Sequence, residues 1–235
     1  MAARQIILDT ETTGLNARLG DRVIEIGCIE LVNRRPTGNH FHRYLNPERE
    51  VELGASQVHG MTREDLADKP RFAEIATDFV DYVRGAELVI HNAPFDVEFL
   101  DRELDLAGLG SLSSHCAGVV DTLAMARELH PGKRNNLNAL CERYAVDNSR
   151  RTLHGALLDA ALLSEVYLAM TRGQESLMME PAEPAAVAGV AAFDASKLVV
   201  LRATQAEIAE HGKVLDAIDA ASEGGSVWRR PAAPG

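Results

Sequence analysis

The chain has 235 residues, of which 46% are hydrophobic, and its formal net charge is −11. This length allows one good-sized domain with an appendage, or two small domains. Because no run approaches the roughly 20 apolar residues of a membrane helix and strand-like sequence begins by Gln5, we expect neither a membrane anchor nor a secretory signal. Three widely spaced cysteines without a Cys-x-x-Cys pattern favour reduced thiols in a cytosolic protein over zinc or disulfides.

The acidic charge argues against a protein that holds nucleic acid unaided, since phosphate binding normally relies on Lys and Arg. A nucleic-acid substrate would need positive charge from bound metals, local basic patches or a partner. Two small basic pairs, Lys133–Arg134 and Arg150–Arg151, are candidates for phosphate contacts. Most such pairs are simply solvated surface.

The first three expected elements are strands, at residues 5–9, 22–33 and 41–45, with a turn over residues 34–39. Three strands in succession predict an antiparallel meander. Thr62 with Asp65 is typical of a helix N-terminus, and the apolar spacing over residues 72–83 predicts a helix. Short buried strands at 88–90 and 119–120 then alternate with helices expected at 95–106, 122–129, 137–144 and 155–171. This order predicts a mixed α/β sheet with helices on its faces.

The composition changes near residue 180. A Pro- and Ala-rich stretch follows and is predicted to be a linker, after which residues 198–201 are strand-like and residues 205–221 helix-like. Because about 40 residues are too few for a secure core of their own, this tail is expected to dock on something. We therefore expect three parts: residues 1–173, 174–193 and 194–235.

The most informative motif is Asp9-x-Glu11, where the first apolar run ends. Side chains two apart on a strand share a face, so both carboxylates project together from the end of a buried strand. Held so close, they repel and are costly to desolvate unless a cation joins them. The plainer reading is an acidic turn that caps backbone amides, so a metal site needs further ligands.

Other acids also follow buried segments. Asp96 lies in the first turn of a helix after a buried strand, a position that also suits an acid at a helix dipole. Asp159 lies among apolar residues of a helix, so its buried charge needs a cation or hydrogen-bond donors to offset the cost of burial. His154, five residues earlier, cannot point to the same place on a continuous helix, so we expect it in the preceding loop. Asp121 more simply caps a helix and is a reserve ligand.

Together these motifs resemble the DEDDh 3′–5′ exonuclease family. The resemblance covers about residues 5–172 and rests on three motifs in order: Asp9-x-Glu11, Asn92-x-x-Phe95-Asp96 and His154-x4-Asp159. Residues 127–141 and 151–159 resemble the branch of this family that proofreads for bacterial replicative DNA polymerases.

The resemblance implies a ribonuclease H-like fold and two Mg²⁺ or Mn²⁺ ions held by Asp9, Glu11, Asp96 and Asp159. His154 would take a proton from the attacking water, and the products would be nucleoside 5′-monophosphates released from a DNA 3′ end. Four residues near the motifs would contact the terminal nucleotides of a single-stranded or frayed end: Thr13, Leu15, His59 and Phe95. Ordinary core or turn packing explains these four about equally well.

The resemblance also implies partners in the bacterial replisome. Residues 174–179 resemble short peptides that bind the sliding clamp, with Gln174, Leu177 and Met179 as the contact residues, although Met179 stands where an aromatic is usual. The tail after residue 193 would hold the polymerase catalytic subunit. Two alternatives stay open: an exonuclease of this family that trims RNA or small oligonucleotides, and a non-catalytic subunit that stabilises the polymerase.

Overall fold

The computed structural model describes residues 4–149, 151–172 and 203–221. The chain divides into two units, residues 1–180 and 181–235, and each is considered by itself. The five strands of the first unit are β1 Arg4–Thr12, β2 Val23–Val32, β3 Arg35–Tyr44, β4 Glu87–Ile90 and β5 Gly118–Asp121. Its helices are α1 Leu53–His59, α2 Arg63–Leu66, α3 Phe72–Val83, α4 Ala93–Leu106, α5 Thr122–Leu129, α6 Leu137–Tyr144 and α7 Ala156–Met170, with 3-10 turns at Ala17–Leu19 and Leu112–Ser114.

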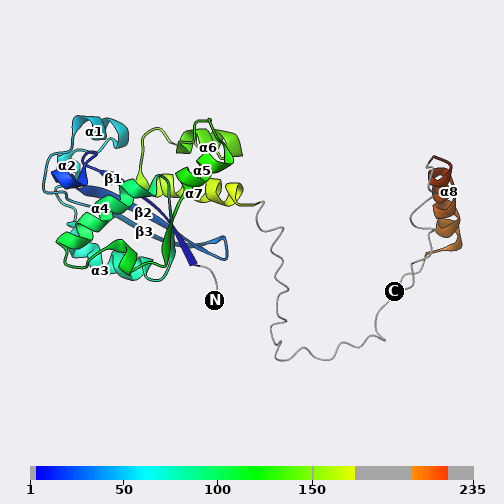
Figure 1. Cartoon of the computed structure of the whole chain (residues 1–235), viewed down its shortest axis with the longest axis horizontal. Coiled ribbons are helices and arrows are strands. Elements are labelled where there is room, and N and C mark those ends of the chain that lie inside the picture. Colours follow the sequence, from blue (N-terminus) through cyan, green and yellow to red (C-terminus); the bar gives the residue numbers. More distant parts are fainter. Residues whose placement is uncertain (1–3, 150, 173–202, 222–235) are drawn as a thin grey trace, which may run out of the picture. The chain divides into compact units, whose positions relative to one another are not determined.

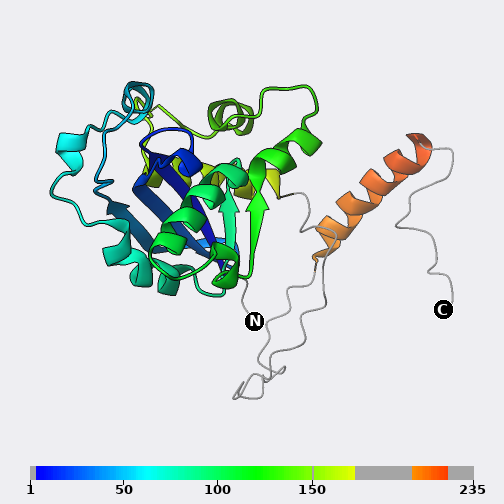
Figure 2. The same ribbon diagram turned by 60° about the vertical axis from the view of Figure 1, so that its left-hand side comes forward.

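The strands form one sheet in the order β3-β2-β1-β4-β5. β1, β2 and β3 pair antiparallel, whereas β4 pairs parallel with β1 and β5 pairs parallel with β4. The predicted mixed sheet, with its three-strand meander, is therefore confirmed. Figure 2 shows β5 (green) at one edge of the sheet, leading directly into α5.

Two helical layers cover the sheet (Figure 1). The alternation of side chains along β1 sends Ile6 and Leu8 into the core beneath α3 and α4, and Ile7 into the core beneath α5, α6 and α7. All three side chains are fully buried, as expected of a central strand with both faces covered. The end of β1 therefore lies between the two helical layers.

The turn between β2 and β3 differs from the prediction. Val32 pairs with Arg35, so the connection is only Asn33-Arg34, and both residues have positive φ, 49° and 62°. Two successive left-handed residues suit the tight hairpin connections whose twist matches that of the strands. β3 is an edge strand, which is why it accommodates Pro36 within the stretch predicted to be the turn.

Most other predicted elements are present at or near their expected bounds. α5 and α6 span the predicted residues, and Thr62 with Asp65 forms a capping box at α2. α1 was not predicted from the sequence. In the second unit the predicted helix is α8, Gln205–Ala221, whereas the predicted strand at 198–201 lies outside the described residues. Among the residues described, no helix is both long enough and apolar enough to span a membrane.

A close approach between α7 and β2 fixes the position of the helix that carries Asp159. A β-carbon at Gly27 would lie 2.2 Å from the backbone nitrogen of Leu157 and 2.3 Å from the carbonyl carbon of Ala156. Gly27 is also the β2 partner of Asp9. The absent side chain thus allows the first turn of α7 to lie directly beside the end of β1.

We predict that Gly27→Ala lowers the stability of the fold, because the new methyl group must push the first turn of α7, which carries Asp159, off the sheet. Overpacking of this kind costs about 1–3 kcal/mol. Gly118→Ala, in β5, is the matched control, since a β-carbon there meets open space. Chemical unfolding of both variants tests this; equal stability of the two would contradict the role given to Gly27.

Candidate active site

The five family-motif residues line one cavity of about 480 Å³ at the carboxyl end of β1: Asp9, Glu11, Asp96, His154 and Asp159. β1 and β4 run parallel, with Leu8 beside Ile90, so their carboxyl ends meet at the same edge of the sheet. Asp9 and Glu11 come from the first of these ends. Asp96 comes from the first turn of α4, which begins three residues after β4.

Asp96 is held by Thr10, whose side chain lies on the face of β1 opposite to Asp9 and Glu11. Its Oδ1 accepts a hydrogen bond from the Thr10 hydroxyl at 2.7 Å and another from the Thr10 backbone nitrogen at 3.1 Å. Thr10 lies between the two acids in sequence and therefore points to the other side of the strand. β1 thus contributes two acids on one face and positions a third on the other.

Asp159 lies in the first turn of α7 and is 3% exposed. His154 lies outside this helix, which begins at Ala156, as predicted from the spacing of the two residues. The His154 backbone nitrogen donates a hydrogen bond to the carbonyl oxygen of Val58 in α1 at 3.1 Å, and this bond attaches the loop to that helix. Its Nδ1 lies 3.7 Å from Asp159 Oδ2, and the side chain is 43% exposed.

Burial raises the pKa values of Asp9, Glu11 and Asp96 and so favours their protonated forms. Burial, followed by the charges of Asp96, Asp159 and Glu11, raises the pKa of Asp9 well above its usual value. Burial, followed by the charge of Asp159, raises the pKa of Glu11 to about 8. Burial likewise raises the pKa of Asp96 to about 7, although the hydrogen bonds from Thr10 oppose the shift. A bound cation removes this penalty.

The donor set fits a divalent metal ion. Ligand atoms of Glu11, His154 and Asp159 all lie within 4.8 Å of one another. Carboxylate oxygens are the ligands that Mg²⁺ prefers, and Mn²⁺ accepts them too. Asp9 and Asp96 face the same cavity. The cavity therefore offers more carboxylates than one Mg²⁺ ion usually takes from a protein.

Two of the four predicted nucleotide contacts also line this cavity, Leu15 and Phe95. Leu15 is 83% exposed, so its apolar side chain faces the solvent at this cavity. His59 lines an adjoining cavity of about 320 Å³, together with Leu15 and Phe95. Thr13 lines neither; it is fully buried and its hydroxyl donates to Asp21 at 3.0 Å.

The remaining sequence candidates fall elsewhere. Asp121 caps α5, since its side chain accepts from the Leu123 nitrogen at 2.9 Å. Lys133 lines a cavity of about 530 Å³ that shares His91, Asn92 and Asn136 with the cavity of the acids. Arg150, Gln174, Leu177 and Met179 lie outside the described residues.

Sequence reasoning missed the role of Arg151 inside the site. Its Nε and Nη2 donate to the two oxygens of Asp159 at 2.5 and 2.6 Å, and its Nη2 also approaches His154 Nδ1 at 3.2 Å. Its side chain is only 7% exposed, so it is not the solvated surface residue that a basic pair suggests. Thr10 was missed as well, although strand alternation between Asp9 and Glu11 was a usable signal.

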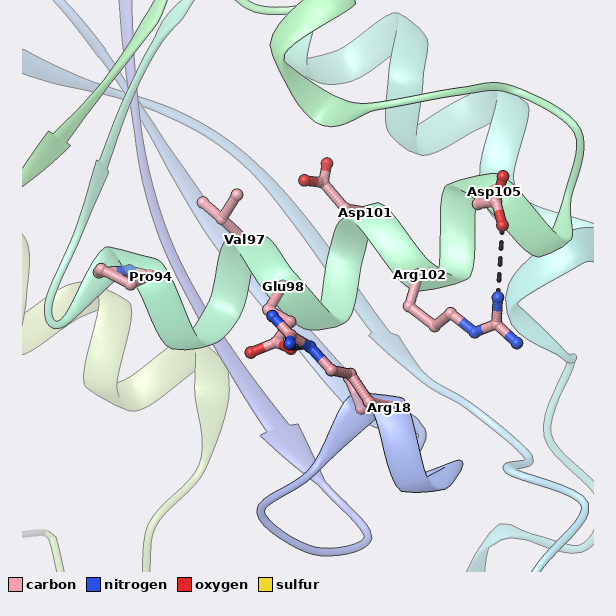
Figure 3. Close-up of a pocket in the computed structure, with 8 residues that line it drawn as sticks. Arg18, Pro94, Val97, Glu98, Asp101, Arg102 and Asp105 are labelled. Carbon is pink, nitrogen blue, oxygen red and sulfur yellow. Dashed lines mark hydrogen bonds and ion pairs between the residues drawn. The ribbon is translucent and has the colours of Figure 1, made fainter.

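A further cavity, of about 610 Å³, lies over the exposed face of α4 (Figure 3). It is lined by charged pairs such as Arg18–Glu98, 2.6 Å apart, and Arg102–Asp105, 3.3 Å apart. The labelled acids lie along the helix surface rather than converging on a point. None of the five motif residues lines it, and we regard it as a solvated helix face.

The fold and the cluster of acids define a class: metal-dependent exonucleases. A family model described as Exonuclease matches residues 6–167. The chain is 53% identical to DNA polymerase III subunit epsilon of Escherichia coli strain K12, over 96% of this chain and 97% of the relative. It is 57% identical to the same subunit of Haemophilus influenzae, over 75% and 71% of the two chains.

Solved structures share the fold. Exonuclease X in complex with 5′ overhanging duplex DNA superposes with a TM-score of 0.57 at 24% identity, over 73% of this chain and 93% of that one. Exonuclease I without ligand gives 0.65 at 18% identity, over 75% and 44%. The chain belongs to the exonuclease family and, within it, to the DNA polymerase III epsilon subunits. The prediction of a 3′–5′ proofreading exonuclease is thereby confirmed; exonucleases of this kind use divalent metal ions.

We predict that Glu11→Gln stabilises the protein in EDTA at high pH but not at low pH. The pKa of Glu11 rises from 4.5 to about 8 on folding. Its protonated form therefore contributes stability that is fully present below pH 4.5 and is lost progressively as the pH rises from there to about 8. Wild type and variant should thus unfold at the same temperature near pH 4, and the variant at a higher temperature near pH 9.

Saturating Mg²⁺ should reverse the order at high pH, because an ionised carboxylate at position 11 attracts a divalent cation in this cavity more strongly than a neutral amide does. Thermal unfolding with EDTA or Mg²⁺ across this range provides the measurement. A wild type that gains stability over the variant in EDTA as the pH rises would refute the shifted pKa.

Proposed function

We propose that the chain removes nucleotides from the 3′ end of DNA as nucleoside 5′-monophosphates, with preference for mismatched ends. The observation that carries the proposal is the convergence of Asp9, Glu11, Asp96, Asp159 and His154 on one cavity. These residues come from β1, α4, α7 and the loop before α7. An acidic cluster that only keeps the surface solvated would not be expected to bring residues so far apart in sequence together in a buried site.

Four of these residues would hold two Mg²⁺ or Mn²⁺ ions. Asp9 would bridge the two, Glu11 and Asp159 would complete one site, and Asp96 would serve the other. Such ions orient the scissile phosphate, lower the pKa of the attacking water and stabilise the leaving oxygen. The protein itself fixes the carboxylates: Thr10 holds Asp96, and the close contact at Gly27 sets the position of Asp159.

His154 would act as the general base. Burial lowers the pKa of its imidazole below 6.5, and the positive charge of Arg151 lowers it further against the opposing charge of Asp159. The ring is therefore neutral near pH 7, as a base must be. Its position on a half-exposed loop gives it access to water and substrate, while Asp159 stays fixed on its helix.

The terminal nucleotide would enter the cavities lined by Leu15, Phe95 and His59. Exposed Leu15 offers an apolar surface for an unstacked base, and Phe95 lies beside it. A mismatched end frays at lower cost than a paired one, so such a site favours it. Thr13, buried behind this surface, would act by holding the turn rather than by touching the base.

Positive charge near the site comes from Lys133 and Arg127, which share a cavity wall with Asn135. These side chains are suited to the phosphates upstream of the scissile one. They are few against a net charge of −11, which supports delivery by a partner rather than tight binding of DNA by the chain alone. Tethering supplies a high effective concentration without new DNA contacts.

The partner would be the polymerase catalytic subunit in the bacterial cytoplasm, bound by residues 194–235. α8 supports this, because it exposes three large aliphatic side chains: Ile208, Val214 and Ile218. Residues 174–193 would form the connection, with Gln174, Leu177 and Met179 as contacts for the sliding clamp.

Asp9→Ala is expected to abolish exonuclease activity, since it removes the acid that we assign to both metal ions. The assay uses a 5′-labelled DNA with a mismatched 3′ end, with Mg²⁺ or with EDTA. Wild type should give a ladder of one-nucleotide steps that EDTA suppresses. Activity of the variant equal to wild type would refute the mechanism, and faster cleavage of a matched RNA would favour the RNA-trimming alternative.

Ile208→Asp combined with Ile218→Asp is expected to prevent polymerase binding while leaving hydrolysis of free DNA ends intact. Two charges would replace the apolar side chains of α8 that we assign to the interface. Glu210→Gln, also exposed on α8, serves as the matched control. Co-purification with the polymerase subunit measures the effect, and undiminished binding by the double variant would exclude α8 from the interface.

A further inference from the structure

Arg151 forms the tightest polar contact of the site. Its guanidinium binds both oxygens of Asp159 side by side, at 2.5 and 2.6 Å, in the fork geometry that arginine offers to carboxylates. Both side chains are buried, 7% and 3% exposed. A third nitrogen, Nη1, donates to Asn138 Oδ1 on α6 at 2.9 Å. The guanidinium therefore lies inside the cavity, among the acids.

This contact and a metal ion at Asp159 compete for the same oxygens. A carboxylate engaged by two short charge-assisted hydrogen bonds has little left to offer a metal ion, which needs close oxygen contacts. A divalent cation beside a guanidinium whose side chain is only 7% exposed would also meet electrostatic repulsion. Asp159 can serve one cation or the other at full strength, but not both.

We propose that Arg151 is a built-in counter-cation that binds Asp159 and must release it before the metal site is complete. The proposal rests on the metal site described under the proposed function. Arg151 is accordingly a positioning residue. It keeps the Asp159 carboxylate paired and aimed into the cavity, and it sets how much metal the site requires.

The surroundings of Arg151 allow this exchange. It precedes α7 in the loop that also carries His154, so it can shift without moving the helix. The hydrogen bond to Asn138, which is exposed at the cavity wall, need not break when Asp159 is given up. The same shift withdraws Nη2 from His154 Nδ1, so the general base is released in the same step.

The size of the effect follows from linkage. A site that is open only part of the time binds its ligand more weakly by the open fraction. If pairing keeps Asp159 closed nine-tenths of the time, removal of Arg151 tightens metal binding about tenfold, or about 1.4 kcal/mol. A lysine in its place keeps the charge but loses the two-pronged contact. The metal affinity of Arg151→Lys should therefore fall between those of wild type and Arg151→Gln.

The test measures Mn²⁺ affinity by electron paramagnetic resonance in wild type, Arg151→Gln and Arg151→Lys. Arg22→Gln is the matched control, because Arg22 makes the same two-pronged contact with buried Glu103, at 2.7 and 2.8 Å, outside the site. We expect Arg151→Gln to bind Mn²⁺ about tenfold more tightly, Arg151→Lys to be intermediate, and Arg22→Gln to match wild type.

A second measurement follows Arg151 by nuclear magnetic resonance in the wild-type chain. The Nε–H resonance of Arg151, identified by its absence in Arg151→Lys, should shift as Mg²⁺ is added to the wild-type chain. Arg22 Nε should stay constant.

Three results would overturn the inference: unchanged or weaker Mn²⁺ binding by Arg151→Gln, an Arg151→Lys affinity equal to wild type, or an Arg151 resonance indifferent to saturating Mg²⁺. Failure of every variant and of wild type to bind metal would instead refute the proposed function itself.

Discussion

Repulsion among buried carboxylates is the constraint on which this structure depends. Asp9, Glu11, Asp96 and Asp159 share one cavity, and burial alone already makes ionisation of three of them costly. A chain selected only for stability would not gather these groups. The structure tolerates them because each of two acids has its own donor, Thr10 for one and Arg151 for the other. The repulsion that these donors leave uncompensated would be relieved by a bound divalent cation. The same repulsion that weakens the fold would therefore strengthen metal binding.

The geometry of the cluster follows from the two faces of a single central strand. Residues of β1 alternate between the layer of α3 and α4 and the layer of α7. Thr10 engages α4 through Asp96, while Asp9 is paired with Gly27, against which α7 begins. One strand end thereby fixes carboxylates from both layers, and all four acids lie on strands or helices rather than on loops. Only His154, which we propose as the general base, lies on a loop.

Much of this could be predicted from the sequence, because acids that follow apolar runs are local signals. The strands around Ile7 and Val89 are short continuous apolar runs, and the helix around Leu162 has apolar residues at helical spacing, so all three could be assigned. The placement of His154 followed from helical geometry. Pairing between side chains leaves no such signal. The Arg151 guanidinium reaches Asp159, eight residues away, through the path of the loop before α7, and its neighbours in sequence suggest a solvated surface. α1 was missed because it buries little apolar surface: Leu53 is 75% exposed and Val58 43%.

The acidity of the whole chain is consistent with this site rather than opposed to it. A proofreading nuclease with strong affinity of its own for DNA would degrade correct ends as readily as it found them. Here the few cationic groups near the cavity, such as Lys133, lie beside a site whose own cation, Arg151, is occupied by Asp159. Under the proposed function, selectivity then comes from two requirements that act in series. A partner must deliver the end, and the end must fray before it reaches the carboxylates; neither requires the chain to recognise a base.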